Sequence, residues 1–223
     1  MTASGRLKVR LGEYDLINST DCAESEGRLV CAPAPLSEPV AEALLPASYS
    51  AGALSQDLAL LRLPRATSTT DFIRPVCLPE TGMHLEPNSV LHATGWGELL
   101  NSSHSGRYAH IKKNVSLPVW NMTDCKKTYE TLHLPDSIIC AGGVGADTCR
   151  GDSGGPLTVR AGGRAVLVGV TAAGYPRCGT AGFPGLYTSI AHYLPWIRHV
   201  LTRPLKPAST SKFISTLKII YVS

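Results

Sequence analysis

The chain has 223 residues, of which 43% are hydrophobic and 17% are charged, and its formal net charge at pH 7 is +4. A chain of this length and composition can bury a substantial core, which excludes an intrinsically disordered protein. No basic cluster is dense enough to indicate nucleic-acid binding, and no apolar run approaches the length of a transmembrane helix.

Short alternating apolar runs, separated by Gly, Pro and Asn, predict β-strands along most of the chain. In chain order, these runs include residues 8–11, 58–63, 110–119 and 165–170. The only segment with clear helical spacing is 190–201, near the C-terminus. The sequence therefore predicts a mostly β protein with a C-terminal helix.

The most informative motif is GDSGGP at residues 151–156. It places Ser153 between glycines, whose backbone can turn sharply and expose both a hydroxyl group and bare N–H groups. A serine hydroxyl attacks a carbonyl carbon when a base removes its proton and fixed donors stabilise the oxyanion that forms. The motif therefore predicts a catalytic nucleophile, and the rest of the chain must supply the base.

Two catalytic architectures contain such a serine. The motif also fits the G-x-S-x-G turn of α/β-hydrolases, in which an acid and then a histidine follow the serine. No Asp or Glu follows Ser153, so His192 and His199 would have no later carboxylate to orient them, and the hydrolase order fails. The remaining order places histidine, aspartate and serine in succession, as in chymotrypsin-like proteases.

Six segments resemble those of the trypsin-like serine proteases. In chain order they are VRLGEY at 9–14, DLALLRL at 57–63, RPVCLP at 74–79, GWG at 95–97, GDSGGP at 151–156 and PGLYT at 184–188. The resemblance runs from residue 8 to residue 201. Cys22 and Cys31, followed by APAP at 32–35, are most similar to the arthropod clip-domain serine proteases.

The resemblance implies a trypsin-like double antiparallel β-barrel with a C-terminal helix and an incomplete first barrel. We expect a protease domain over residues 1–202, with a remnant of the first barrel at 1–88. The second barrel is expected at 89–189 and the helix at 190–202. Residues 203–223 are expected to form a basic tail outside the family match.

By this resemblance Ser153 is the nucleophile, Asp57 is the triad acid, and the N–H groups of Gly151 and Ser153 form the oxyanion hole. Asp152 matches the acid that pairs with the α-amino group created when the zymogen is cut. All seven histidines follow Asp57, so none matches the catalytic base. We therefore expect an N-terminally truncated chain that is inactive alone. The alternative is a non-catalytic protease homologue, or truncated isoform, with a binding or regulatory role.

The resemblance also implies a preference for cleavage after Arg or Lys. Asp147, six residues before the nucleophile, matches the floor of the primary specificity pocket, where a carboxylate selects cations. Gly174 and Gly185 match wall positions at which a side chain would block a long basic residue. The family usually has a serine and an aromatic residue before the first of these glycines, whereas this chain has Ala172 and Ala173.

The chain has seven cysteines, an odd number. The disulfides implied by the resemblance are Cys22 with Cys31, Cys125 with Cys140, and Cys149 with Cys178. Cys77 is left unpaired. In clip-domain proteases a cysteine at this position ties the catalytic domain to an upstream regulatory segment, so we expect Cys77 to mark a lost N-terminal piece.

The disulfide pattern predicts an oxidising, extracellular location and therefore a secreted protein. Acceptor sequons for N-glycosylation begin at Asn18, Asn101, Asn114 and Asn121. The expected partners are protein substrates, serpin-type inhibitors and an upstream activating protease.

No cofactor is expected. Glu13 matches the first ligand of a calcium loop in trypsin-like relatives, but the bridge between Cys22 and Cys31 would reshape that loop. Calcium binding at Glu13 is therefore not favoured.

Overall fold

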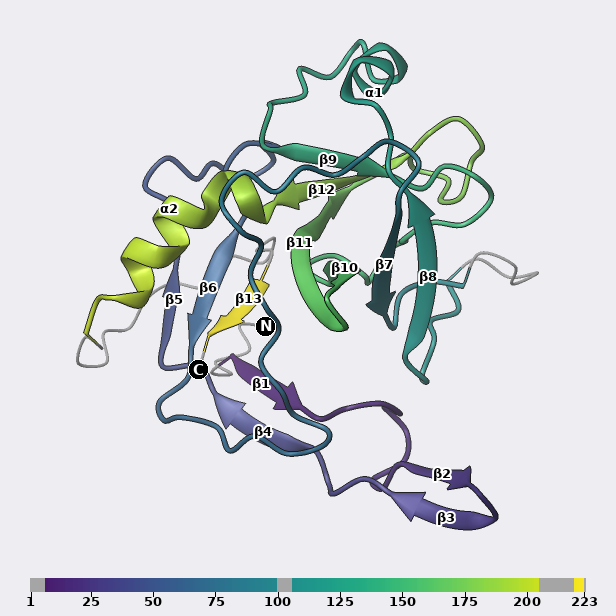
Figure 1. The fold of residues 1–223 in the computed structure, drawn as a ribbon, viewed down its shortest axis with the longest axis vertical. Helices are drawn as coiled ribbons and strands as arrows, with labels where there is room; N and C mark the ends of the chain where they lie inside the picture. The colour runs from purple at the N-terminus through teal and green to yellow at the C-terminus, as the bar shows by residue number, and fades with distance from the viewer. Residues whose placement is uncertain (1–6, 100–105, 205–218, 223) are drawn as a thin grey trace, which may run out of the picture.

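The computed structural model describes residues 7–99, 106–204 and 219–222, and most of the regular secondary structure in these ranges is antiparallel sheet (Figure 1). The strands are β1 Lys8–Leu11, β2 Cys22–Ser25, β3 Arg28–Cys31, β4 Leu36–Pro39, β5 Glu42–Leu44, β6 Ala59–Arg62, β7 Val90–Gly95, β8 Lys113–Pro118, β9 Ile138–Ala141, β10 Pro156–Ala161, β11 Arg164–Ala173, β12 Gly185–Ser189 and β13 Ile219–Val222. The helices are α1 Met122–Thr128 and α2 Ile190–Leu201. The mostly β prediction and the C-terminal helix are confirmed.

The largest sheet has six strands in the order β8-β7-β10-β11-β12-β9, and it curls on itself. Its two end strands meet at their ends, where the Gly142 N–H donates to the Pro118 carbonyl at 3.0 Å and Val119 forms a bridge with Ala141. Alternation along β8 points Leu117 into the enclosed core, where it packs with Tyr187 and other buried residues. This curled sheet carries the nucleophile motif at the start of β10.

Strand β6 joins the N-terminal part of the chain to the rest of the core. It lies beside β5 in the smaller sheet, and its side chains alternate between two clusters. Leu60 packs against α2, whereas Leu61 packs against Val9 on β1 and Val40 after β4. Each leucine is 1% exposed, and burying such a side chain stabilises the fold by about 1.5–3 kcal/mol.

The tail expected outside the fold contributes one strand. Residues 219–222 form β13, which pairs in parallel with β6 and places Ile219 opposite Ala59. The sequence analysis expected no strand here. The strand lies along the edge of β6 that β5 leaves open.

Helix α2 closes the fold on one side of β11 (Figure 1). Ser189 caps its N-terminus by accepting a hydrogen bond from the His192 N–H at 3.4 Å. Its apolar face is buried against β6 and β11 through side chains that include Tyr193, Leu194 and Ile197. Helix α1 was not predicted, because its seven residues are too short to show a period.

The cysteines form three disulfides, which join the pairs that the resemblance implied. One closes the hairpin of β2 and β3, which extends away from the rest of the fold in Figure 1. Another ties α1 to β9. The third joins Cys149, in the nucleophile loop, to Cys178. Cys77 is free and half-buried.

Candidate active site

Ser153 lies exposed in a tight turn immediately before β10. The turn requires glycine at two positions, because Gly151 and Gly154 have φ angles of 94° and 83°. The Gly154 N–H then donates to the Thr171 carbonyl on β11 at 3.0 Å, which fixes the turn to the sheet. The local sequence therefore places Ser153 at the surface, in a turn that is fixed to β11.

The two N–H groups expected in the oxyanion hole donate no hydrogen bond within the described residues. The Asp152 N–H between them donates to the Cys149 carbonyl at 3.0 Å. In the part of the chain that the structure describes, neither Gly151 nor Ser153 donates a backbone hydrogen bond. An oxyanion is stabilised by N–H groups that the fold holds in position and that donate to no other acceptor.

The Asp152 carboxylate is held by backbone donors. Its Oδ1 accepts from the Gly97 N–H at 2.8 Å, and its Oδ2 accepts from the Cys149 N–H at 2.9 Å. A Cβ atom on Gly95 or Gly97 would overlap this carboxylate, which explains why both glycines of the GWG segment are needed. The acid therefore ties the nucleophile loop to the end of β7.

Asp57 is buried directly before β6, and two other elements hold its backbone. Its carbonyl accepts a hydrogen bond from Thr188 Oγ1 on β12 at 3.0 Å. The preceding residue, Gln56, has a φ of 57°, and its N–H donates to the Tyr193 hydroxyl on α2 at 2.7 Å. A non-glycine residue in this region is strained, and the bond to α2 holds it there.

Strands β11 and β12 connect the Asp57 segment with the Ser153 loop. Thr171 on β11 accepts from the nucleophile turn, and it pairs with Tyr187 on β12. The next residue along β12 is Thr188, which holds the Asp57 carbonyl. Sequence reasoning missed the positioning roles of Thr171 and Thr188, because threonine is an ordinary strand residue. The only signal was that Thr188 ends the PGLYT segment.

The three residues expected to form the specificity pocket lie together. A Cβ atom on Gly185 would lie 2.8 Å from Asp147 Oδ1, so any side chain there would strike the carboxylate. A Cβ atom on Gly174 would lie 3.8 Å from the Gly185 Cα atom. Asp147, which is 8% exposed, therefore lies directly against Gly185, and Gly174 lies next to Gly185.

Burial raises the pKa of Asp147 to about 6, and the negative charge of Asp152 adds to this effect. Hydrogen bonds from the backbone of Thr148 and Gly179 act in the opposite direction. Gly179 follows Cys178, so the disulfide to Cys149 holds one of these donors beside the acid. A cationic ligand would supply a positive charge beside the Asp147 carboxylate.

Thr148 and Tyr187 complete the surroundings of Asp147. The Thr148 Oγ1 and the Tyr187 hydroxyl lie 2.9 Å apart and share a hydrogen bond. Burial raises the pKa of Tyr187, so this phenol stays neutral. Sequence reasoning did not identify either residue, although Thr148 directly follows the predicted acid.

No described histidine hydrogen-bonds to Ser153. His110 instead contacts Asp15 at 3.0 Å, and this hydrogen bond is the main cause that lowers the pKa of Asp15 to about 2. His92 contacts Ser116 at 3.3 Å. His104 lies outside the described residues.

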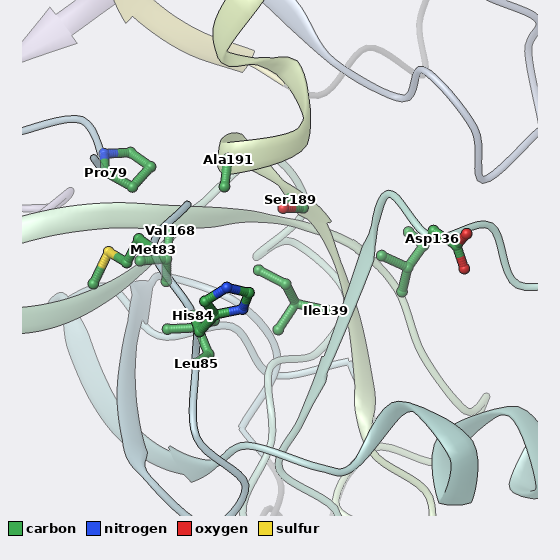
Figure 2. Close-up of a pocket in the computed structure, with 10 residues that line it drawn as sticks. Pro79, Met83, His84, Leu85, Asp136, Ile139, Val168, Ser189 and Ala191 are labelled. Atoms are coloured by element: carbon green, nitrogen blue, oxygen red, sulfur yellow. The ribbon is translucent and has the colours of Figure 1, made fainter. Parts of the chain in front are cut away.

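A cavity of about 200 Å³ lies elsewhere, at the N-terminal end of α2. Figure 2 shows the residues that line it, with His84 next to Ile139 and with Ser189 and Ala191 of the β12–α2 junction nearby. Asp136 lies at the right of this view. None of the candidate catalytic or specificity residues lines it.

The Glu13 loop has two acids but no clear metal site. Glu13 is buried and forms an ion pair with Arg10, and its Oε1 accepts from the Tyr14 N–H at 3.0 Å. Asp21 Oδ2 accepts from the same N–H at 3.1 Å. Over residues 7–99, 106–204 and 219–222, no three His, Cys, Asp or Glu side chains form a group suited to a metal ion.

Within the same described ranges, no helix has both the length and the apolar character needed to cross a membrane.

Comparison with known families matches residues 5–197 to the family described as Trypsin. The Spaetzle-processing enzyme of Drosophila melanogaster is 40% identical over 206 residues, covering 86% of this chain and 50% of the relative. The phenoloxidase-activating enzyme 1 of Spodoptera litura is 39% identical over 199 residues, covering 87% of this chain and 51% of the relative. The chain thus spans about half the length of these relatives.

A solved structure has a similar fold. Neuropsin, a serine protease of mouse brain, superimposes with a TM-score of 0.71 at 26% sequence identity. The match covers 88% of this chain and 79% of neuropsin. The curled six-stranded sheet and the C-terminal helix therefore belong to a double β-barrel architecture.

Proposed function

Because this chain belongs to the trypsin family of serine proteases, we propose that it carries the nucleophile and the specificity pocket of a secreted endopeptidase that cleaves after Arg or Lys. Ser153 attacks the scissile carbonyl, and the N–H groups of Gly151 and Ser153 stabilise the oxyanion. Asp57 orients the histidine base. The chain has no histidine before Asp57, so these residues alone lack that base.

The observation that carries the proposed specificity is the buried acid beside two glycines. Asp147 is 8% exposed, and only glycine fits beside its Oδ1 atom at position 185. A buried carboxylate with a raised pKa gains most from a ligand that brings its own positive charge and donors. Arginine and lysine side chains have both, and Gly174 leaves room for their long stems.

The substrates are proposed to be proteins of an extracellular cascade. Two relatives are named for processing Spaetzle and for activating phenoloxidase, and a third is a CLIP domain-containing serine protease of Anopheles gambiae. The three disulfides support an oxidising compartment. Serpin-type inhibitors and an upstream activating protease are the further partners that such a role requires.

Cys77 is proposed to bind a regulatory segment by a disulfide. The thiol is free and half-buried, and its backbone is fixed on β11 by bonds to Ala165 and Leu167. A thiol on a fixed backbone that is only half-buried is placed to form a disulfide with a partner of suitable geometry. Hydrolysis at this site needs no cofactor, and calcium near Glu13 is not part of the proposal because Arg10 already neutralises that acid.

A second candidate function is that of a non-catalytic homologue or truncated isoform that binds substrates or regulators. It is the role that these 223 residues could perform by themselves, because no histidine precedes Asp57 in them. Without a general base, a triad retains only the small residual catalysis of binding and the oxyanion hole.

Hydrolysis of an arginyl ester tests the catalytic proposal. The chain alone is expected to show no turnover above a Ser153→Ala control. The natural protein, purified from its source, is expected to hydrolyse the arginyl ester and to lose activity when an organophosphate labels Ser153. A natural protein that carries a matching histidine yet hydrolyses no arginyl ester would contradict the endopeptidase proposal and leave the binding role.

A further inference from the structure

Arg150 lies in the nucleophile loop and directly precedes Gly151, one of the two proposed oxyanion donors. One peptide group joins the two residues. Its carbonyl, from Arg150, accepts a hydrogen bond from the Glu98 N–H at 2.8 Å, and its N–H belongs to Gly151. The Arg150 side chain is 65% exposed. A mobile cation is therefore attached to the same fixed peptide group that would hold the scissile carbonyl oxygen.

Glu98 also holds the Arg150 side chain. Its Oε2 lies 3.3 Å from Arg150 Nη1, and its Oε1 accepts from the Gly106 N–H at 2.7 Å. The Glu98 side chain is only 10% exposed. Among the described residues, Glu98 is the only hydrogen-bond partner of the guanidinium. Because a guanidinium has five N–H donors, the Nε and Nη2 groups can still bind a second acceptor.

The surroundings of Gly151 suit a ligand with negative charge. The Tyr108 ring lies against Gly151, because a Cβ atom there would lie 3.0 Å from the ring Cε1 atom. Arg107, next to this tyrosine, is exposed. Of the acids near the loop, Asp152 accepts from two backbone N–H groups and Asp147 is buried. The exposed charges of the two segments beside Gly151, 106–108 and 149–151, are therefore basic.

A substrate must pass close to Arg150. In the proposed mechanism the scissile carbonyl oxygen lies at the Gly151 N–H. An extended chain advances about 3.3–3.6 Å per residue, so a long arginine side chain that starts at the neighbouring residue reaches about two residues along it. Guanidinium groups form charge-assisted hydrogen bonds with carboxylates, and these bonds are often bidentate.

We propose that Arg150 is a specificity-determining residue that binds an acidic side chain of the protein substrate, close to the cleaved bond. This inference rests on the proposed function, because Ser153 and Asp147 must first place the substrate. Asp147 then selects the basic residue at which the chain is cut. Arg150 selects among such residues for those that have Asp or Glu within about two positions on either side.

Competition binding tests the proposal on the chain itself. Because these residues contain no catalytic base, arginine peptides should bind without being cut, and they should displace p-aminobenzamidine from the pocket. The peptides share one sequence and carry Asp, Asn or Lys at a single position before or after the arginine. The Asp peptide is expected to bind about two- to fivefold more tightly than the Asn peptide, and the Lys peptide should bind most weakly. The position at which Asp helps most identifies the side of the bond.

Variants of Arg150 are compared through the ratio of the Asp-peptide affinity to the Asn-peptide affinity. This ratio cancels any change in the pocket that affects both peptides equally. Arg150→Lys should keep a ratio above one, Arg150→Gln should bring it to one, and Arg150→Glu should bring it below one. Arg74→Gln is the matched control, because Arg74 is 66% exposed and lies outside the loop, and it should keep the parental ratio.

Salt separates a charge effect from a change in packing. About 1 M salt shortens the Debye length to about 3 Å, so it should bring the parental ratio close to one. Equal binding of the Asp and Asn peptides to the parent at low salt, or an unchanged ratio in Arg150→Gln, overturns the role of Arg150. Displacement of the amidine by these peptides would then still support the Arg/Lys pocket. A folded chain that binds none of the arginine peptides contradicts both proposals.

Discussion

Asp147 has the strongest functional signature of any single residue, because the fold disfavours its charge. Burial raises its pKa to about 6 from 3.8, so the folded chain holds this proton more tightly than the unfolded chain does. The stability that it contributes is complete below pH 3.8 and is lost as the pH rises through 6. At neutral pH the ligand-free chain therefore carries a destabilising carboxylate.

Asp147→Asn tests this account through stability. The variant removes the charge, so its free energy of unfolding at pH 8 should exceed that of the parent by roughly 1–2 kcal/mol. The difference should disappear near pH 4, where the parent is protonated. Urea unfolding across this pH range measures it. A variant that is less stable than the parent at pH 8 would show that the carboxylate is compensated within the fold.

Thr188 is the residue that holds the Asp57 backbone. Its hydroxyl is fully buried and donates to the Asp57 carbonyl at 3.0 Å. Thr188→Val keeps the shape and removes this donor to a buried carbonyl, at a cost of about 0.5–1.5 kcal/mol. Urea unfolding should show this loss, whereas the exposed control Thr123→Val should change little. Equal stability of the Thr188 variant and the parent would rule out the positioning role.

The sequence motifs indicated the candidate site residues, whereas no sequence pattern indicated the residues that hydrogen-bond and pack around them. Gly174 and Gly185 are far apart in the chain, and the resemblance nevertheless brought them to one pocket, where the structure shows them adjacent. Thr148 and Tyr187 lie equally close to the acid, but a Thr–Tyr hydrogen bond has no pattern along the chain. Such contacts follow from strand register, which the sequence does not reveal.

At the scale of elements, α2 depends on β6. Arg62 at the end of β6 donates from Nη2 to the Val200 carbonyl at 2.8 Å and from Nη1 to the Pro204 carbonyl at 3.2 Å. It also forms an ion pair with Glu42. The guanidinium thus adds a donor to the Val200 carbonyl, which the Arg203 N–H also reaches at 3.1 Å, and it places a positive charge at the negative end of the helix dipole.

Arg62→Ala is expected to lower the free energy of unfolding by about 2–4 kcal/mol, because it leaves Glu42 without its cation and removes two hydrogen bonds to the end of the helix segment. Arg74→Ala is the matched control. Its side chain is 66% exposed and its partner Asp71 is 85% exposed, so the loss should stay below about 1 kcal/mol. Thermal unfolding followed by circular dichroism compares the two. Equal losses would mean that the helix end does not need Arg62.

Element prediction succeeded where a period was long enough to see. Twelve residues of α2 show a clear apolar face, and the helix forms where it was expected. The seven residues of α1 are held by the Asn121 cap and by the disulfide from Cys125, neither of which produces a period. Strand β13 depends on pairing with the distant β6, so its sequence alone could not place it.

At the scale of the whole molecule, the second barrel is well formed, whereas the N-terminal part of the described chain has only small sheets. The nucleophile loop, the pocket and the disulfide between Cys149 and Cys178 all lie on the larger sheet or its loops. We therefore expect the proposed pocket to form without a catalytic base. This separates ligand binding, which the chain should retain, from hydrolysis, which it should lack.

Equilibrium binding of p-aminobenzamidine, followed by its fluorescence at pH 8, tests this separation most directly. The amidinium group is expected to pair with Asp147, giving saturable binding that Asp147→Asn abolishes and that the exposed control Asp136→Asn leaves unchanged. A folded chain that does not bind the amidine, or binds it equally well after Asp147→Asn, would contradict the assignment of an Arg/Lys pocket.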